Sequence, residues 1–221
     1  MQESRPSPLI CATLPAVVLA GGLSRRMGSP KFGIPLGGRP MLSRIVARLQ
    51  PQVGSIAVNL NVDPAGAIEN NVPVIADTVA GFLGPLAGVL TAMRHVAATD
   101  PHASHVVVVP TDTPFFPDDL VTCMAAAMTE HQQIAVAASN DQMHPLFGLW
   151  PVALADELEG FLTSDPKRRV RAFIESHPSV TVDFPLIQTL KGAFDPFFNV
   201  NTPEDLIDAE QWLRFFGDER E

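Results

Sequence analysis

A glycine-rich, basic segment at residues 17–31, VVLAGGLSRRMGSPK, has the residue types that bind phosphate. Its glycines and basic residues are Gly21, Gly22, Gly28, Arg25, Arg26 and Lys31. Glycine lacks a β-carbon, so successive backbone N–H groups can approach a ligand closely and surround an anion. Arginine adds forked donors and lysine a compact charge, and both suit a polyphosphate. The segment is therefore a candidate phosphate-binding loop.

The sequence of this segment excludes two common types of phosphate-binding loop. It contains neither the G-x-x-x-x-G-K-[ST] pattern of a P-loop nor the G-x-G-x-x-G pattern of a dinucleotide fold. An ordinary glycine turn with solvated arginines is the alternative interpretation. The elements around the loop have to decide between the two.

Charge is distributed unevenly along the chain. The formal net charge is −9, which argues against nonspecific binding to nucleic acid or to an anionic membrane. Seven of the fifteen Lys and Arg residues nevertheless precede Asp63, whereas Glu3 is the only acidic residue that does. We therefore expect the first third of the chain to face a small anion.

Length and composition favour one globular domain. The chain has 221 residues, 46% of them hydrophobic, and we expect a flexible tail at 1–14 followed by a single domain at 15–217. Cys11 and Cys123 are too few for a disulfide framework and fit no metal-ligand spacing, which favours the cytoplasm. The apolar run at 9–20 is interrupted by Pro15, so we interpret it as a tail and a strand rather than a signal peptide.

Strands and helices alternate through the first half. The pattern predicts strands at 16–20, 55–59, 72–76 and 105–109, with helices from Pro40 to about Pro51 and at 85–98. This rhythm is typical of an α/β sheet with parallel order, in which ligands bind at the carboxyl ends of the strands. Asn59, Asp77 and Asp112 follow three of these strands. The alternative for each is a turn or a helix cap.

The second half of the chain has a different order of predicted strands and helices. The pattern at 134–138 and 143–150 predicts a pair of antiparallel strands, in which we expect His144 to make a structural hydrogen bond. Helices follow at 152–161 and 170–177, and a short strand at 180–183. The basic run 167–169 is either a solvated face or a second anion site.

A helix cap is predicted near the C-terminus. Thr202 is a good N-cap, Pro203 suits the first helical position and Asp205 can complete a capping box. Asn199 and Asn201 flank the end of the preceding strand, where they either face a second substrate or form a turn.

Four motifs together resemble one enzyme family, over residues 16 to about 215. They are Leu19-Ala20-Gly21-Gly22-x-Ser24-x-Arg26-Met27-Gly28-x-x-Lys31, Gly84-Pro85-Leu86-x-Gly88, Pro110-x-Asp112-x-Pro114 and Asn199-Val200-Asn201-Thr202-Pro203-Glu204-Asp205-Leu206. This combination resembles the MobA family of nucleotidyltransferases, the molybdenum cofactor guanylyltransferases.

The resemblance implies a fold and a reaction. The expected fold is a three-layer, Rossmann-like α/β nucleotidyltransferase with a mostly parallel central sheet. The expected reaction is transfer of GMP from GTP to molybdopterin, with Mg²⁺ as cofactor and pyrophosphate as the second product. The N-terminal half would bind GTP and Mg²⁺, and the C-terminal half the acceptor. Such an enzyme is expected to be a cytoplasmic monomer that binds no nucleic acid or membrane and transiently contacts proteins that assemble or receive the cofactor.

The resemblance also implies roles for individual residues. Arg26, Lys31 and Asp112 would be catalytic, and Asp112 would hold the magnesium. The candidate acceptor residues, Arg169, Asn199 and Asn201, come instead from their own sequence context, the basic run at 167–169 and the strand end before Thr202. The nucleotide-binding residues would be Leu19, Ala20, Gly21, Gly22, Lys31, Asn59, Asp77 and Asp112.

The loop lysine has an unusual neighbour. Pro30 precedes Lys31, where the family usually has an acidic residue, and this Pro-Lys pair is similar to that of sugar-phosphate nucleotidyltransferases. The Gly21-Gly22 pair is more similar to the sequence of guanylyltransferases than to that of cytidylyltransferases, which commonly have Ala-Gly at this place. A cytidylyltransferase, a sugar-phosphate nucleotidyltransferase and a non-catalytic nucleotide-binding adaptor therefore remain the alternatives.

Overall fold

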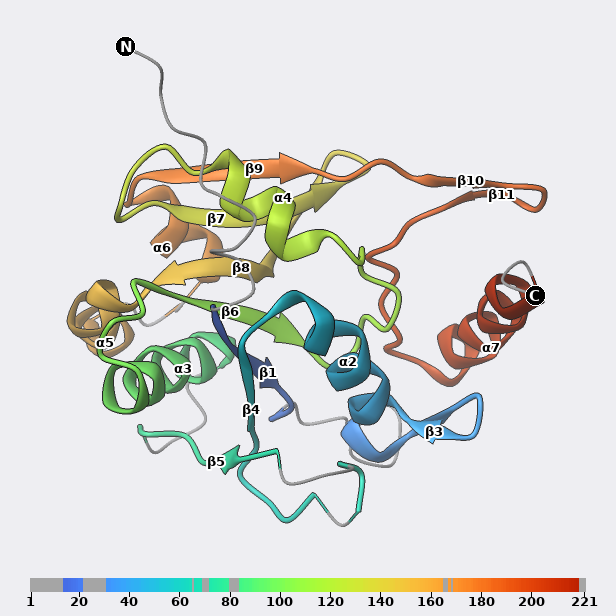
Figure 1. Ribbon diagram of the computed structural model, residues 1–221, viewed down its shortest axis with the longest axis horizontal. Coiled ribbons are helices and arrows are strands. Elements are labelled where there is room, and N and C mark those ends of the chain that lie inside the picture. The colour runs from blue at the N-terminus through green and yellow to red at the C-terminus, as the bar shows by residue number, and fades with distance from the viewer. Residues whose placement is uncertain are drawn as a thin grey trace.

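The fold is described from a computed structural model (Figure 1), which defines residues 14–21, 31–64, 66–68, 72–79, 84–164, 167 and 169–218. Most of the predicted N-terminal tail lies outside these residues. So do Gly22, Arg26 and Gly28 of the predicted phosphate-binding loop.

A seven-stranded sheet forms the centre of the molecule. Its order is β5 (Val74–Ile75), β4 (Ser55–Asn59), β1 (Pro15–Leu19), β6 (His105–Pro110), β8 (Gln142–Pro151), β7 (Ile134–Ser139) and β9 (Ser179–Asp183). Every neighbouring pair that excludes β8 is parallel, and β8 is antiparallel to both of its neighbours. The predicted mostly parallel sheet and the antiparallel pair of the second half are both confirmed.

Helices cover both faces of this sheet. Figure 1 shows α2 (Met41–Leu49) and α4 (Leu120–Ala127) on one side, with α3 (Pro85–Thr99), α5 (Ala155–Ser164) and α6 (Val170–Glu175) on the other. Short 3₁₀ turns occupy Lys31–Gly33, Gln50–Gln52 and Val152–Leu154. The result is the three-layer α/β arrangement that was predicted.

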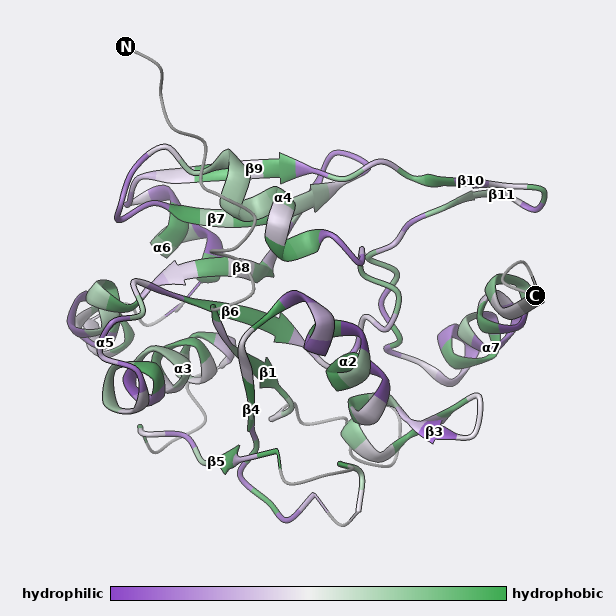
Figure 2. Cartoon of the chain, viewed as in Figure 1, coloured by the Kyte–Doolittle hydropathy of each residue, from purple (hydrophilic) through white to green (hydrophobic). Residues whose placement is uncertain are grey.

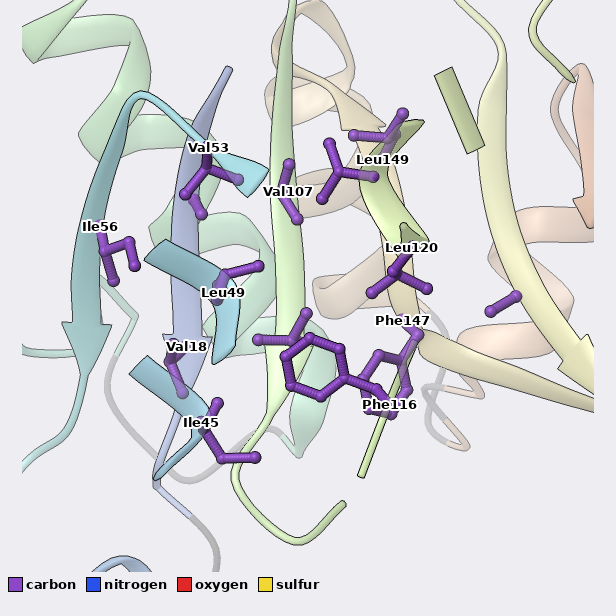
Figure 3. Packing of buried hydrophobic residues seen from close by; sticks show 14 of the residues in the cluster. Val18, Ile45, Leu49, Val53, Ile56, Val107, Phe116, Leu120, Phe147 and Leu149 are labelled. Atoms are coloured by element: carbon purple, nitrogen blue, oxygen red, sulfur yellow. The ribbon is translucent and has the colours of Figure 1, made fainter. Parts of the chain in front are cut away.

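The middle residues of β1 and β6 are apolar (Figure 2) because both faces of these strands are buried. Side chains alternate across a strand, so Val107 and Val109 pack with α2 and α4, whereas Val106 and Val108 pack with α3. Figure 3 shows the first of these two cores, in which Leu49 of α2 and Leu120 of α4 lie over the sheet. Burial of β6 on both faces explains its run of valines.

A third, smaller core joins α7 (Pro203–Asp218) to the rest of the molecule. Phe115, which follows β6, packs edge-on against Phe194 with ring centroids 5.2 Å apart. Phe194 ends β11 (Gly192–Phe194), which pairs with β10 (Ile187–Thr189), and it also contacts Trp212 of α7. This core attaches the C-terminal helix beside the loop that carries Asp112.

Three local expectations differ from the structure. Residues 197–200 form an irregular loop rather than the expected strand end, and Val200 makes one backbone hydrogen bond, to the carbonyl of Asp112. A second hairpin, β2 (Pro35–Leu36) with β3 (Arg39–Pro40), precedes α2, so Pro40 lies in a strand and the helix begins at Met41. The strand expected at 72–76 is reduced to Val74–Ile75, at the edge of the sheet.

Among the described residues, no helix combines the length and the apolar composition needed to cross a lipid bilayer.

Candidate active site

The candidate site lies at the carboxyl edge of the sheet, between β1 and β6. Leu19 is in register with Asn59 of β4 on one side and with Pro110 of β6 on the other. Beyond these strand ends, the backbone N–H of Thr111 donates to Leu19 O at 3.2 Å and that of Ala20 to Asn59 O at 2.9 Å. The chain order reverses at β1, and such a switch point is where open α/β sheets bind ligands.

Lys31, Asp112 and Asn201 meet at this edge. Lys31 Nζ lies 3.1 Å from Asp112 Oδ2 and also donates to Asn201 Oδ1. Because an ammonium group can only donate, the contact fixes Asn201 with its amide oxygen toward the lysine. The Lys31 side chain is 17% exposed and that of Asp112 is 28% exposed, so the pair can be reached from solvent.

Each member of this cluster is positioned by a different element. Lys31 opens a 3₁₀ turn whose next residue, Phe32, is buried in the core. Asp112 follows the buried strand β6, and its carbonyl accepts the Val200 N–H at 2.7 Å. Asn201 immediately precedes the cap of α7.

The predicted capping box of α7 is confirmed. Asp205 Oδ2 accepts the backbone N–H groups of Asn201 and Thr202, both at 2.8 Å. In return, Thr202 Oγ1 accepts the Asp205 N–H at 3.2 Å. The cap therefore fixes the backbone of Asn201 as well as the start of the helix.

A second polar cluster lies at the ends of β4 and β5. Asn59 Nδ2 donates to Asp77 Oδ1 at 2.9 Å and to Ile75 O at 3.2 Å. Asn61 Nδ2 donates to Asp77 Oδ2 at 2.8 Å, and its own amide oxygen accepts the Asp77 N–H. Sequence reasoning missed Asn61, although its place two residues after Asn59, beyond the same strand, was a usable signal.

Gly88 of α3 lets this second cluster lie close to the helix. A β-carbon at Gly88 would come within 2.8 Å of Asn59 Oδ1 and 2.9 Å of Leu19 Cδ2. This close approach fixes the end of β4 against α3.

Leu19, Ala20 and Gly21, which are also predicted to bind nucleotide, lie at the end of β1, between the strands that lead to the two clusters. Leu19 ends β1, Ala20 is buried and Gly21 is exposed. The roles that the resemblance implies for these residues stay predictions, as do those of Asn59 and Asp77. Gly22 and Arg26, which share the same predicted site, lie outside the described residues.

The three predicted acceptor residues fall in different places. Asn199 is exposed, and its Oδ1 contacts the hydroxyl of buried Thr113, next to Asp112. Asn201 joins Lys31 directly. Arg169 is exposed at the N-cap of α6, and within the described part of the chain no contact links it to Lys31 or Asp112. Its predicted role in acceptor binding is untested.

The described basic residues of the first third do not all lie at this site. Lys31 joins the site, but Arg44 donates to Leu36 O and Gly37 O, and Arg48 donates to Phe116 O and pairs with Asp118 at 3.2 Å. These two arginines line a cavity of about 390 Å³ between α2 and α7. The expectation that the first third of the chain faces a small anion therefore does not hold for Arg44 and Arg48, because backbone carbonyls and Asp118 already engage them.

Asp112 is the only carboxylate of the Lys31–Asp112–Asn201 cluster and therefore its candidate metal ligand. In the described part of the chain, no group of three or more His, Cys, Asp and Glu side chains could hold a metal ion. Mg²⁺ is commonly bound through one or two carboxylates and the phosphate oxygens of a substrate. An accessible carboxylate beside a lysine fits that kind of shared site and does not fit an all-protein metal site.

His144, at the start of β8, makes the predicted structural hydrogen bond. Its Nε2 lies 2.7 Å from Ser139 Oγ, which in turn donates to Asp195 Oδ1 at 2.7 Å. Sequence reasoning identified neither Ser139 nor Asp195, because each is polar in a segment without a recognisable motif.

Comparisons with known proteins agree on one family. The family model for the MobA-like NTP transferase domain matches residues 16–181. A Rhizobium meliloti (strain 1021) protein named molybdenum cofactor guanylyltransferase is 58% identical over 204 residues, covering 92% of this chain and 94% of that protein.

Solved structures agree on the fold. The molybdopterin-guanine dinucleotide biosynthesis protein A of Archaeoglobus fulgidus matches with a TM-score of 0.67 and 24% identity, covering 91% of this chain and 99% of that one. The 4-diphosphocytidyl-2C-methyl-D-erythritol synthase of Anaerococcus prevotii matches with a TM-score of 0.64 and 14% identity, covering 92% and 99%. The same architecture therefore occurs in proteins whose names refer to guanine and to cytidine nucleotides.

Proposed function

The chain belongs to the family of MobA-like NTP transferase domains, and we propose that it transfers GMP from GTP to molybdopterin and releases pyrophosphate. The reaction proposed is the one named for relatives that are up to 58% identical over most of the chain. The structural observation that carries the proposal is the Lys31–Asp112–Asn201 cluster at the switch point of the sheet.

The reaction needs alignment and charge neutralisation more than a side-chain nucleophile. An oxygen of the acceptor's terminal phosphate forms a bond to the α-phosphorus of GTP, while the bond from that phosphorus to the α,β-bridging oxygen breaks. The bonding electrons leave with pyrophosphate. Because the attacking phosphate is already an anion, no base has to remove a proton. Fixed positive charge and in-line positioning supply the catalysis.

The described residues suit these two tasks. Lys31 is held at the carboxyl edge by Asp112 and Asn201, so its charge is positioned before substrate binds. A preorganised cation of this kind stabilises the charge that develops on the leaving pyrophosphate. We propose that Asn59 and Asp77 contact the guanosine part of GTP, and that Arg26 adds a second positive charge.

Asp112 is the residue that we propose to hold Mg²⁺. The ion would neutralise charge on the triphosphate when bound. The same carboxylate accepts from Lys31 Nζ, so Lys31 has to release Asp112 Oδ2, or share it, when the metal and GTP enter. Freed from Asp112, the lysine can donate to a phosphate oxygen.

Nucleotide choice gives the sharpest test of this function. The purified chain would be incubated with molybdopterin, Mg²⁺ and each of GTP, CTP, ATP and UTP, and pyrophosphate and the dinucleotide product would be measured. We expect GTP to be used at least about 10-fold better than CTP, the discrimination that a difference of about 1.4 kcal/mol in binding gives. Preferential use of CTP, or of a sugar phosphate in place of molybdopterin, would replace this proposal with one of the related activities.

The setting proposed for this activity is a monomer in the cytoplasm. Cys123 is a free thiol, as expected in a reducing compartment. We further propose transient contact with proteins that assemble or receive the cofactor. A non-catalytic adaptor would bind GTP without releasing pyrophosphate, so the same incubation separates it from an enzyme.

A further inference from the structure

Ser139, His144 and Asp195 form a hydrogen-bonded chain near the carboxyl edge of the sheet. Ser139 ends β7 and is 1% exposed, and its hydroxyl lies 2.7 Å from both His144 Nε2 and Asp195 Oδ1. Because β7 runs in the same direction as β6, Ser139 lies at the edge where Asp112 follows β6. The proposed reaction does not use this cluster.

The hydrogen bonds determine which nitrogen of His144 carries a proton. The Asp195 carboxylate can only accept, so the single Ser139 proton is directed to Asp195. The Ser139 oxygen must then accept from His144, which places a proton on Nε2. Burial lowers the pKa of His144, although the Asp195 carboxylate opposes this shift, and a neutral ring protonated at Nε2 has an acceptor lone pair on Nδ1.

His144 is half-buried, so its ring is partly open to solvent. No described residue forms a hydrogen bond with His144 Nδ1. In the described part of the chain, Trp150 Nε1 is the only fully buried side-chain nitrogen or oxygen without a partner, so Nδ1 is not sealed within the core. His144 therefore presents an oriented acceptor at the surface of the protein.

The ring of His144 also stacks on the loop that leads to Asn201. The rings of His144 and Phe197 are 4.4 Å apart with an interplanar angle of 12°. Asp195 Oδ1 accepts the Phe197 N–H at 2.8 Å, which fixes the start of this loop. Three residues lie between Phe197 and Asn201, so the Cα atoms of these two residues are at most about 14 Å apart, and His144 and the lysine cluster lie at the two ends of one short loop.

An irregularity in β8 sets the place of His144. Gly148 pairs with Val136, but the next pair along β7 is Ala137 with His144, so residues 145–147 are extra in β8. Such bulges re-aim side chains and are common beside active sites.

We propose that His144 binds the acceptor by accepting, through Nδ1, a hydrogen bond from an N–H group of its pterin ring. This inference rests on the proposed function, in which the phosphate end of the same molecule lies at Lys31 and Asp112. In this arrangement the pterin ring lies at His144 and the phosphate-bearing side chain extends along the loop from Phe197 to Asn201. The pterin ring has N–H groups, and a neutral imidazole nitrogen can accept a hydrogen bond from one of them.

Two variants separate substrate binding from a structural role. H144Q places an amide near the Nε2 position and keeps the donor to Ser139, but it loses the Nδ1 acceptor. H144N places its amide oxygen near the Nδ1 position and keeps the acceptor, but it loses the bond to Ser139. Both remove the ring stacked on Phe197, so each is a control for the other.

Steady-state kinetics with GTP, Mg²⁺ and molybdopterin, together with thermal unfolding, would test the inference. We expect H144Q to raise KM for molybdopterin about 3- to 10-fold, the range given by one neutral hydrogen bond, with KM for GTP unchanged. H144N should keep KM for molybdopterin closer to wild type and yet have the lower Tm. H144Q should therefore be the variant with the weaker binding of molybdopterin, and H144N the variant with the lower thermal stability.

If His144 had only a structural role, the variant with the lower Tm would also have the higher KM for molybdopterin. That result, or an unchanged KM in H144Q, would overturn the inference. The wild-type chain run in parallel tests the proposed function separately. Transfer of GMP by the wild type with no effect of H144Q on KM refutes only the role of His144, whereas no transfer to molybdopterin by the wild type refutes both.

Discussion

Lys31 Nζ and Asp112 Oδ2 lie 3.1 Å apart at the carboxyl edge of the sheet, although 81 positions separate the two residues in the chain. Asn201, from a third part of the chain, accepts from the same ammonium group. These contacts bring together Lys31, the carboxylate that follows β6 and the residue that precedes the cap of α7. The candidate active site therefore depends on three distant parts of the chain that the fold brings together.

Removing the charge of Asp112 should slow the reaction strongly. We expect D112N to lower GMP transfer by roughly 10²-fold or more, the scale found when a preorganised charge-stabilising group is lost, and K31A to do the same. Initial rates of pyrophosphate release would measure both. D118N is the matched control, because Asp118 pairs with Arg48 and is 64% exposed. A folded D112N protein with near-normal turnover would leave Asp112 only a structural role.

Gly88 should tolerate no side chain. In G88A the new β-carbon would lie 2.8 Å from Asn59 Oδ1 and 2.9 Å from Leu19 Cδ2, so we expect a loss of about 1–3 kcal/mol in the free energy of unfolding. Because Asn59 has to move, affinity for GTP should fall as well. Urea unfolding and GTP titration would measure the two effects.

G160A provides the control for this experiment. Gly160 lies in α5, and a β-carbon there would meet no atom within 4 Å. Alanine in a helix should raise the free energy of unfolding by about 0.5–1 kcal/mol and leave GTP affinity unchanged. Equal effects of the two substitutions would contradict the packing argument.

Removing the cap of α7 should cost stability. T202A removes the acceptor for the Asp205 N–H, and we expect the free energy of unfolding to fall by about 1 kcal/mol. T163A removes a hydroxyl that bonds Gly160 O near the end of α5, and its effect should stay within about 0.5 kcal/mol. Urea unfolding of both variants would measure the difference, and a T202A protein as stable as wild type would exclude an energetic role for the cap.

Stability should fall at mildly acidic pH because of His105. Burial lowers the pKa of His105 below its ordinary value of 6.5, and Nε2 lies 3.3 Å from Gln133 O. Below pH 6.5 the unfolded chain therefore binds a proton that the folded chain does not, so this contribution is complete above pH 6.5 and is lost as the pH falls toward the lowered value.

Urea unfolding between pH 8 and pH 5 would measure this loss. H105Q cannot gain the proton, so its free energy of unfolding should fall less over that range than that of the wild type. Identical slopes in the two proteins would mean that His105 is not held neutral by the fold.

Local features of the site could be predicted from the sequence. The capping box at Thr202–Asp205 needs only four adjacent residues. The strand at 55–59 is indicated by its own short run of residues, SIAVN. The placement of Asn59 and Asp112 at one edge followed from the parallel order of the strands. These features depend on short-range chemistry and on a general rule for α/β sheets.

Contacts between distant segments could not be predicted in the same way. Asp112 was expected as a metal ligand, but nothing in the sequence indicates that it pairs with Lys31. The Ser139–Asp195 bond depends on the loop that leaves β11, and the place of His144 depends on three extra residues in β8. Tertiary packing decides such pairings, and no local pattern records them.

The fate of the individual phosphates of GTP tests the central claim most directly. With molybdopterin and Mg²⁺ present, we predict that label from [α-³²P]GTP appears in a pterin dinucleotide and that label from [γ-³²P]GTP appears in pyrophosphate. D112N should lower both signals together. Release of the γ label as orthophosphate, or an α label that stays in free nucleotides, would contradict nucleotidyl transfer at the Lys31–Asp112 site.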